Sequence, residues 1–239
     1  YMALKNEYME GEWWLVQQAW KKDRLYLGNK VMTWCGSCET ALAKHECEYK
    51  LLNEDSIFLK FPVKGKKNEF LIIWTTTPWT IPFNLAIMVN PELDYVKAKV
   101  EGETWIVGKG LVGPLVQSVV GKALTITEEF KGKTLEGMEY VHPWENKIAT
   151  YSELKKDHLN IHTVILSEEY VDFTAGSGLV HCAPGCGPED QEVGKLYNIP
   201  AFNSLNEKGE FNDETGELFL GLTAKKDDQK FVSELEKAG

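Results

Sequence analysis

Two short segments of this 239-residue chain carry the residue types that could do chemistry. The first, Thr75 to Asn84, reads TTTPWTIPFN and places hydroxyls, an indole and an amide within ten residues that two prolines constrain. The second, residues 176–190, reads GSGLVHCAPGCGPED, a glycine-rich turn followed by His181 and then by Asp190 at an expected helix start. The first segment is typical of a binding wall, and we expect the two segments to form one site.

The elements that must position these residues follow from the apolar periodicity. Strand patterns cover residues 25–34, 46–61, 70–75, 85–89, 95–100, 104–107, 124–130 and 163–166. Helical patterns cover residues 4–22, 109–120, 188–198 and 223–238. The pair Glu101-Gly102 is typical of a hairpin turn, and Cys35 to Cys38 of a tight turn. We expect the residues before Pro78 and Pro82 to be extended. Residues 131–162 favour an irregular excursion.

These elements predict an α+β fold that is mainly β, in the form of a distorted antiparallel β-barrel with peripheral helices. In an extended strand, Thr75 and Thr77 would share one face and Thr76 would lie on the other. Pro78 can twist that alternation, so the spacing leaves open which two threonines face a pocket. Taken alone, three consecutive threonines are more often simple strand formers than a site. A single histidine on a strand, as expected for His181, is likewise usually structural.

The amino-acid composition limits which binding partners and which cellular compartment we expect for this chain. A hydrophobic fraction of 43% is ample for a packed core, and the apolar runs fall short of the roughly 20 residues that a membrane helix needs. The net charge of −10, with Arg24 as the one arginine, argues against a general nucleic-acid binder. Lys64, Lys66 and Lys67 form a loop cluster that could touch a backbone locally, although a solvated turn is the favoured explanation. Five cysteines in no regular spacing fit a reducing compartment, by default the cytoplasm.

Both chemical segments resemble the editing domain that is inserted into isoleucyl-tRNA synthetases. The similarity covers residues 25–51, which resemble the strand leading into the insertion, and residues 70–200, which resemble the insertion itself. The related valyl and leucyl enzymes continue after their threonines with arginine and an acidic residue, where this chain has Pro78-Trp79. The resemblance implies hydrolysis of mischarged tRNA, namely removal of valine from the acceptor end of tRNA(Ile). Because the chain starts within a helical pattern, we expect it to be a monomeric fragment that works with the rest of a longer synthetase.

The resemblance also divides the chain. We expect residues 1–50 to be a flanking synthetase segment with a helix, a strand and the CxxC turn. Residues 51–222 then form the editing domain. Residues 223–239 form its C-terminal helix or a return segment.

The proposed reaction predicts residue types. Isoleucine and valine differ by one methylene, which a hydrophobic pocket separates by only about 1 to 3 kcal/mol, and isoleucyl-tRNA synthetases are the standard example of this limit. A second pocket must therefore pair the α-ammonium of the misplaced residue, hold its ester and bring water to it. Asp190 is the expected counter-ion, although an acid in a first helical turn is also favoured by the macrodipole, by about 0.3 to 1 kcal/mol.

The remaining site residues come from the resemblance alone. It implies that Thr75 and Thr76, with Asp190 and His181, carry out the reaction, and that His181 helps to exclude isoleucine. Residues implied to bind the substrate are Thr77, Trp79, Thr80, Asn84 and Gly185. Backbone amides of the glycine-rich turn would stabilise the oxyanion, with water as the nucleophile and no cofactor.

Further hypotheses come from the positions at which this chain differs from the family and from its cysteine residues. Cys186 stands where many relatives have a second histidine, and Gln191 replaces a common aromatic residue. A thiolate at Cys182 or Cys186 could attack an ester, but water is the favoured nucleophile. Cys35 and Cys38 have the spacing of half a zinc site, which a full-length parent could complete. ATP would serve that parent's synthetic domain, outside this chain.

Two alternative functions remain. One is a valyl-type editing domain that removes threonine. The other is a non-catalytic, zinc-stabilised RNA-binding module that rests on Cys35, Cys38 and the lysine clusters.

Overall fold

The computed structural model describes residues 2–239, which fall into two compact units, one ending at Lys30 and the other spanning Val31–Gly239. The first unit contains helix α1 (Asn6–Lys21), none of whose side chains is buried. Lys21 in its last turn suits the negative end of the helix dipole. The helix predicted over residues 4–22 is confirmed.

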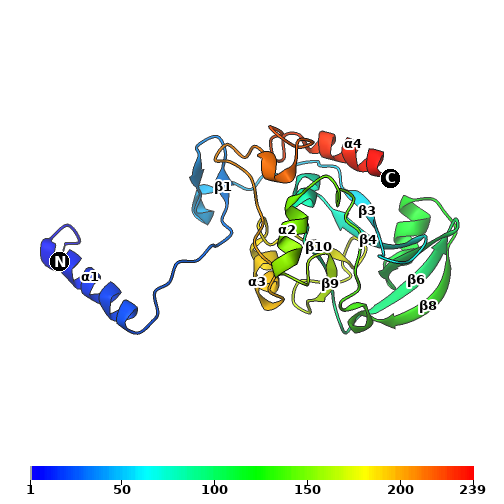
Figure 1. The fold of residues 1–239 in the computed structure, drawn as a ribbon, viewed down its shortest axis with the longest axis horizontal. Helices are drawn as coiled ribbons and strands as arrows, with labels where there is room; N and C mark the ends of the chain where they lie inside the picture. The colour runs from blue at the N-terminus through cyan, green and yellow to red at the C-terminus, as the bar shows by residue number, and fades with distance from the viewer. Residues whose placement is uncertain (1) are drawn as a thin grey trace. The chain divides into compact units, whose positions relative to one another are not determined.

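In the second unit, the strands form three sheets (Figure 1). The strands are β1 (Trp34–Cys35), β2 (Thr40–Ala41), β3 (Ile57–Pro62), β4 (Glu69–Thr75), β5 (Ala86–Val89), β6 (Asp94–Val100), β7 (Glu103–Gly108), β8 (Thr125–Lys131), β9 (Thr163–Leu166) and β10 (Val180–Cys182). Their orders are β1-β2, β10-β5-β9 and β3-β4-β7-β6-β8. The mainly β, α+β class is therefore confirmed.

Strand direction is mixed in the two larger sheets. Most neighbouring pairs are antiparallel, including β6 and β7, which the expected hairpin at Glu101-Gly102 joins. The pairs β4–β7 and β5–β9 are parallel, because long connections return each chain to the same end of its sheet. The segment that follows β9 places β10 on the other side of β5 as its antiparallel partner, with His181 opposite Ile87.

Because successive side chains of β4 point to opposite faces, this strand contributes residues to two hydrophobic cores. Leu71 and Ile73 point into the main core, which joins the two larger sheets, whereas Ile72 points into a smaller one. A π-helical segment, Pro114–Val119, covers the smaller core through Leu115 and Val116. β4 is therefore buried on both faces over residues 71–73.

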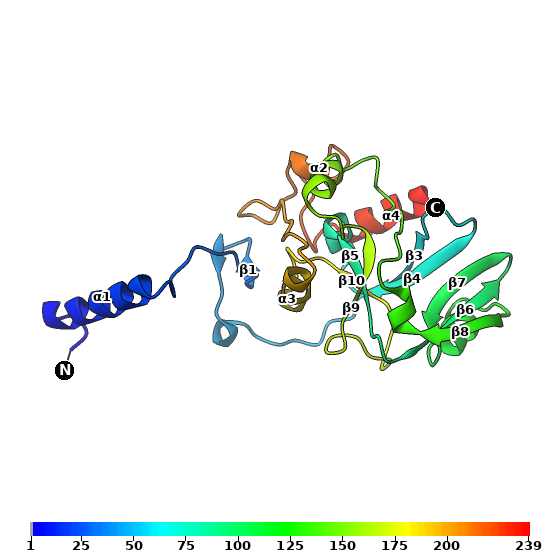
Figure 2. The same cartoon turned by 60° about the horizontal axis from the view of Figure 1, so that its bottom comes forward.

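Helices close the edges of this unit. They are α2 (Thr150–Asp157), α3 (Pro188–Leu196) and α4 (Asp228–Ala238). In both ribbon views α3 lies beside β10 (Figures 1 and 2). α4 buries Phe231 and Leu235, and the Phe231 ring stacks on Phe219 at 5.4 Å and tilts against Phe211 at 5.0 Å. Phe211 in turn stacks on Phe83 at 5.1 Å, so α4 supports the segment that follows the threonines.

Several sequence predictions need correction. The strand expected over residues 25–34 is limited to its last residue, because side chains such as Tyr26 and Leu27 are exposed and have no partner strand among the described residues. Between residues 46 and 61 only β3 is extended as a strand. The excursion of residues 131–162 contains α2, which sequence reasoning missed. Ile81 is not extended: it lies in a 3-10 helix, Pro78–Phe83, despite the following proline, because its side chain is fully buried there.

Within residues 2–239, no helix combines the length and the apolar character that crossing a membrane requires.

We predict that Phe231→Ala lowers the free energy of unfolding by about 3 to 5 kcal/mol, because it removes a fully buried ring from the aromatic cluster. Urea unfolding monitored by circular dichroism measures the change. Glu236→Ala on the exposed face of the same helix is the matched control, with an expected change within about 0.5 kcal/mol. Equal stability of the two variants would contradict the packing described for α4.

Candidate active site

The threonine run marks the end of a strand and the start of a turn. Thr75 ends β4, and its hydroxyl accepts a hydrogen bond from the Thr77 N–H at 3.0 Å. This local bond competes with further strand pairing and turns the chain. Pro78 then occupies the first position of the 3-10 helix, where its missing N–H costs nothing. Thr75 and Thr77 consequently share a side, as strand geometry predicts, while Thr76 is exposed.

The threonine hydroxyls form a chain of hydrogen bonds. Thr75 Oγ1 lies 3.2 Å from Thr77 Oγ1, which lies 3.3 Å from Thr80 Oγ1. The Thr80 hydroxyl donates its proton to the Thr77 carbonyl at 2.8 Å. It can therefore only accept from its other neighbours, and this gives the chain a direction.

His181 continues this chain from strand β10. Its Nε2 lies 2.9 Å from Thr80 Oγ1, and its Nδ1 lies 3.3 Å from Asn84 Nδ2. Asn84 must present its NH2 group here, because the same group donates to the Ala86 carbonyl at 2.9 Å. An amide NH2 only donates, so His181 Nδ1 accepts and Nε2 carries the proton that Thr80 receives.

Burial keeps this histidine neutral. His181 is 9% exposed, and desolvation lowers the pKa of its imidazole to about 4. With one nitrogen accepting and the other donating, both ring nitrogens are occupied by protein partners. The ring is a fixed, uncharged wall and has no free position at which to take up a proton.

Asp190 is the charged group of the site. It lies in the first turn of α3, and one carboxylate oxygen accepts a hydrogen bond from the Ala183 N–H at 3.0 Å. Among residues 2–239 no cation forms an ion pair with it. Burial raises the pKa of Asp190 to about 6, Ala183 opposes the rise and Glu189 adds to it. Gly187 leaves room for the carboxylate, since a Cβ there would lie 2.7 Å from Oδ2.

The two segments meet at a cavity of about 380 Å³. Its lining consists of Trp74, Thr75, Thr76, Thr77, Tyr170, Asp172, Thr174, Ala175, Gly176, Ser177, Gly178, Leu179, Val180, His181 and Asp190. Hydroxyls therefore face carboxylates across a cavity to which the described residues contribute no Lys or Arg. The glycine-rich turn is held by bonds from the Tyr95 hydroxyl to the Gly178 carbonyl at 2.8 Å and from the Gly108 N–H to the Ser177 carbonyl, also at 2.8 Å.

The residues singled out in the sequence take different places. The three threonines, His181 and Asp190 line the cavity together. Thr80 and Asn84 are buried and hold His181 by its two nitrogens, outside the lining. The structure does not bring the remaining two, Trp79 and Gly185, to the cavity. Trp79 packs against the main core, and Gly185 lies against Phe202, with its carbonyl accepting from Asn203 at 2.9 Å.

Sequence reasoning missed Trp74 and Tyr170. Trp74 alternates with buried neighbours on β4, so it resembled an ordinary strand residue, yet it is half-buried and touches the Gly176 turn. Tyr170 lies in a loop, and its hydroxyl donates to Glu192 at 2.7 Å. Its place in the sequence gave no signal, because only folding brings this loop to the cavity.

The cysteines do not supply a nucleophile. Burial raises the pKa of both Cys182 and Cys186, so each thiol stays protonated and neither is activated. At the CxxC turn, the Cys38 N–H lies 3.4 Å from Cys35 Sγ, and hydrogen bonds from Cys38 and then Ser37 lower the pKa of Cys35. In the part of the chain that the structure describes, no group of three or more potential ligands is arranged to hold a metal. The two thiols alone fall short of the four ligands of a structural zinc site.

Comparison with known proteins shows which proteins this chain resembles. Residues 1–101 match the family described as tRNA synthetases class I (I, L, M and V). The whole chain is 44% identical to the isoleucine–tRNA ligase of Pyrococcus abyssi over 245 residues and 39% identical to that of Methanocaldococcus jannaschii over 256 residues. The chain spans only 22% and 24% of the length of these relatives.

The fold gives an independent comparison. The crystal structure of the Plasmodium knowlesi cytosolic leucyl-tRNA synthetase editing domain superimposes with a TM-score of 0.53 at 12% sequence identity. The match covers 77% of this chain and 94% of that one. At 12% sequence identity, this structural similarity establishes the fold alone.

The chain thus matches a segment of class I tRNA synthetases. More particularly, its whole length matches a segment of isoleucine–tRNA ligases, and it has the fold of an inserted editing domain.

We predict that Asp190→Asn stabilises the folded chain at pH 7.5 by roughly 1 to 3 kcal/mol. Burial raises the pKa of Asp190 to about 6 from an ordinary 3.8, so the folded state binds this proton more tightly than the unfolded state. The ionised carboxylate therefore costs stability above pH 6, and the cost disappears as pH falls to about 4. Urea unfolding at several pH values measures the difference between parent and variant.

The matched control is Asp172→Asn, an exposed carboxylate of the same cavity whose pKa is lowered by hydrogen bonds from Thr174. It should not stabilise the chain at pH 7.5. An Asp190→Asn variant that is less stable than the parent chain at pH 7.5 would contradict the conclusion that the Asp190 carboxylate has no cation partner.

Proposed function

We propose that this chain hydrolyses the ester of valine mischarged onto tRNA(Ile). The observation that carries the proposal is the Asp190 carboxylate, which is half-buried on a cavity of hydroxyls and has no cation partner among residues 2–239. A carboxylate of this kind favours a ligand that brings its own positive charge. The α-ammonium of an aminoacyl ester is such a charge, and the sequence relatives reported above are named as isoleucine–tRNA ligases.

The ester fits the opposite wall. With its ammonium at Asp190, the carbonyl and ribose lie toward Thr75, Thr76 and Thr77. The Thr76 hydroxyl is free to donate to the carbonyl, while the hydroxyls of Thr75 and Thr77 use their protons within the threonine chain and can accept from the ribose. The turn of residues 176–178 lines the same cavity and offers backbone N–H groups to the oxyanion. Trp74 is half-buried and lines the same cavity, where its indole suits the flat face of the terminal adenine.

Water is the nucleophile in this scheme. Its oxygen attacks the ester carbon, the bond from that carbon to the ribose oxygen breaks, and the ribose oxygen takes a proton. The neighbouring ribose hydroxyl can relay that proton. Valine and intact tRNA are released, and no bond to the protein forms. Catalysis then rests on positioning and on fixed dipoles, which suits an ester that is already reactive.

His181 serves as a wall in this scheme. Its nitrogens are both occupied, and its lowered pKa leaves it neutral near pH 7, so it neither takes the proton from water nor repels the ammonium. A rigid ring held at two points resists displacement by one extra methylene. The wall therefore contributes to the exclusion of isoleucine.

The partners follow from the same proposal. The acceptor end of tRNA(Ile) supplies the substrate, and the rest of the synthetase supplies most of the tRNA contacts, since a chain with a net charge of −10 attracts RNA only locally. Editing itself would use no metal or organic cofactor, while ATP and a completed zinc site would belong to the longer parent. The free thiols suit a reducing compartment such as the cytoplasm.

We predict that this chain deacylates Val-tRNA(Ile) faster than Ile-tRNA(Ile), and that Asp190→Asn lowers kcat/KM for the valyl ester by about 100-fold or more, because it leaves a buried ammonium unpaired. Release of labelled valine from purified tRNA measures both rates. The adjacent, exposed Glu189→Gln is the matched control and should retain activity.

An Asp190→Asn variant that deacylates like the parent would refute the assigned role of Asp190. Preferential cleavage of Thr-tRNA(Val) would favour the valyl-type alternative.

A pH profile gives a separate test. We expect kcat/KM for the valyl ester to fall as pH drops through about 6, because the free chain must carry an ionised Asp190 to bind the ammonium. The profile should be the same for Glu189→Gln to within a small shift, since Glu189 raises the pKa of Asp190 only as a secondary cause. A rate that is flat from pH 5 to pH 8 would contradict a titrating counter-ion.

A further inference from the structure

A layer of buried polar side chains lies behind His181. Asn84 is fully buried, and its amide is held on every side. Its NH2 group donates to the Ala86 carbonyl at 2.9 Å and approaches His181 Nδ1 at 3.3 Å. Its Oδ1 accepts from the Tyr140 hydroxyl at 2.6 Å, the shortest of the three contacts. Tyr140 is thus one side chain removed from the wall of the cavity.

Tyr140 is itself fixed by the fold. It is 2% exposed, and its N–H donates to the His162 carbonyl at 3.1 Å. Its ring packs edge-on against Phe61 at a centroid distance of 5.1 Å and tilts against the His162 ring at 5.5 Å. Burial raises its pKa well above the ordinary value, so the hydroxyl remains a proton donor.

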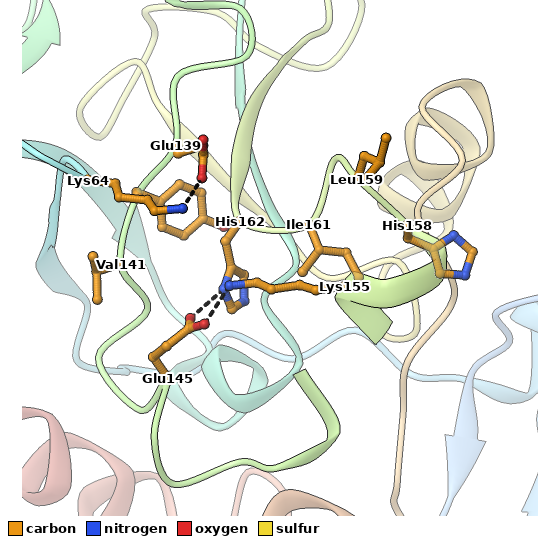
Figure 3. Close-up of a pocket in the computed structure, with 10 residues that line it drawn as sticks. Lys64, Glu139, Val141, Glu145, Lys155, His158, Leu159, Ile161 and His162 are labelled. Carbon is orange, nitrogen blue, oxygen red and sulfur yellow. Dashed lines mark hydrogen bonds and ion pairs between the residues drawn. The ribbon is translucent and has the colours of Figure 1, made fainter. Parts of the chain in front are cut away.

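On its other side Tyr140 borders a second cavity of about 260 Å³, shown in Figure 3. Charged pairs line it: Glu145 pairs with Lys155, and Lys64 pairs with Glu139. Glu145 also contacts His162, whose pKa is lowered by burial. Every one of these charges has a partner, so the cavity does not call for a ligand. The cavity matters here only because it borders Tyr140 and His162, which form the layer between it and the Asn84 amide.

We propose that Tyr140 is a positioning residue for the editing site, which holds the Asn84 carboxamide so that the proton of His181 stays on Nε2. The tautomer part of this inference stands on the hydrogen bonds alone, and its effect on catalysis rests on the function proposed above. Oδ1 is directed at Tyr140, so the NH2 group is left for His181 Nδ1. The imidazole must then donate from Nε2 to Thr80, which fixes the direction of the threonine hydroxyl chain.

Removing the Tyr140 hydroxyl weakens this constraint. The amide then has no donor at Oδ1 and keeps only its donation to the Ala86 carbonyl, so rotation that gives up this one bond and presents Oδ1 to His181 draws the proton to Nδ1. Nε2 would become an acceptor and would no longer donate to Thr80 Oγ1. Because Thr80 already donates to the Thr77 carbonyl, this contact would lose its proton altogether. The His181 ring and the threonine wall would lose a fixed relation to one another.

The test compares Tyr140→Phe with Tyr151→Phe in the full 239-residue chain. Tyr151 is the matched control: it is fully buried and its hydroxyl donates to the Pro82 carbonyl at 2.7 Å, with no contact to Asn84 or His181. Long-range ¹H–¹⁵N spectra report which imidazole nitrogen carries the proton, and loss of signals in His181→Gln assigns them. The parent and Tyr151→Phe should show His181 protonated at Nε2, whereas Tyr140→Phe should show protonation shared between both nitrogens.

The functional readout is the preference for Val-tRNA(Ile) over Ile-tRNA(Ile). We expect Tyr140→Phe to reduce this preference by about tenfold, and Tyr151→Phe to leave it within about twofold. His181 signals in Tyr140→Phe that match the parent would overturn the proposal, as would an altered tautomer with an unchanged preference. If the parent cleaves neither ester, the proposed function fails, and the nitrogen signals still decide whether Tyr140 sets the tautomer.

Discussion

The hydrogen bonds of His181 join the two halves of the site. One connects strand β10 to Thr80 in the 3-10 turn, and the other connects it to Asn84 at the end of that turn. These partners lie about a hundred positions away in the sequence, so nothing local could have aligned them. The bonds work only when the imidazole is neutral with its proton on Nε2, a state that burial and the Asn84 amide enforce together. The cavity depends on this arrangement, because its threonine wall and its glycine turn meet there.

The Asp190 carboxylate adds an opposite requirement. Most of the polar groups around the cavity satisfy one another, whereas this carboxylate is desolvated and receives one N–H from Ala183. An arrangement that costs stability in the free chain and would be relieved by a cationic ligand is characteristic of functional sites. Gly187 and the start of α3 are arranged around it, which indicates that the fold accommodates this cost rather than avoiding it.

Support for the site comes from a distance. The aromatic cluster of Phe83, Phe211, Phe219 and Phe231 fixes the end of the 3-10 turn against α4, and Tyr140 fixes Asn84 from the other side. The turn that bears the site is therefore held between a tightly packed apolar cluster and a buried polar layer. A rigid frame of this kind suits the proposed function, in which the ligands to be distinguished differ by one methylene.

The sequence by itself determined the strands from β4 to β9, the helices α1, α3 and α4 to within about five residues, and the two segments that line the cavity. Apolar periodicity and the Pro and Gly signals are local, and residues such as Pro188 act within one turn of their own position. It could not determine that β4 pairs with β7 and β5 with β9 in parallel, that α2 forms inside a polar excursion, or that Ile81 is helical before a proline. Those outcomes depend on burial against distant elements. Likewise, the residue types placed Thr75 to Thr77, His181 and Asp190 among the candidates. Only the tertiary structure shows that Thr80 and Asn84 lie behind the cavity wall and that Trp79 and Gly185 lie away from it. It also shows that Trp74 and Tyr170 line the cavity. The reason is that packing decides which face of a turn meets a cavity.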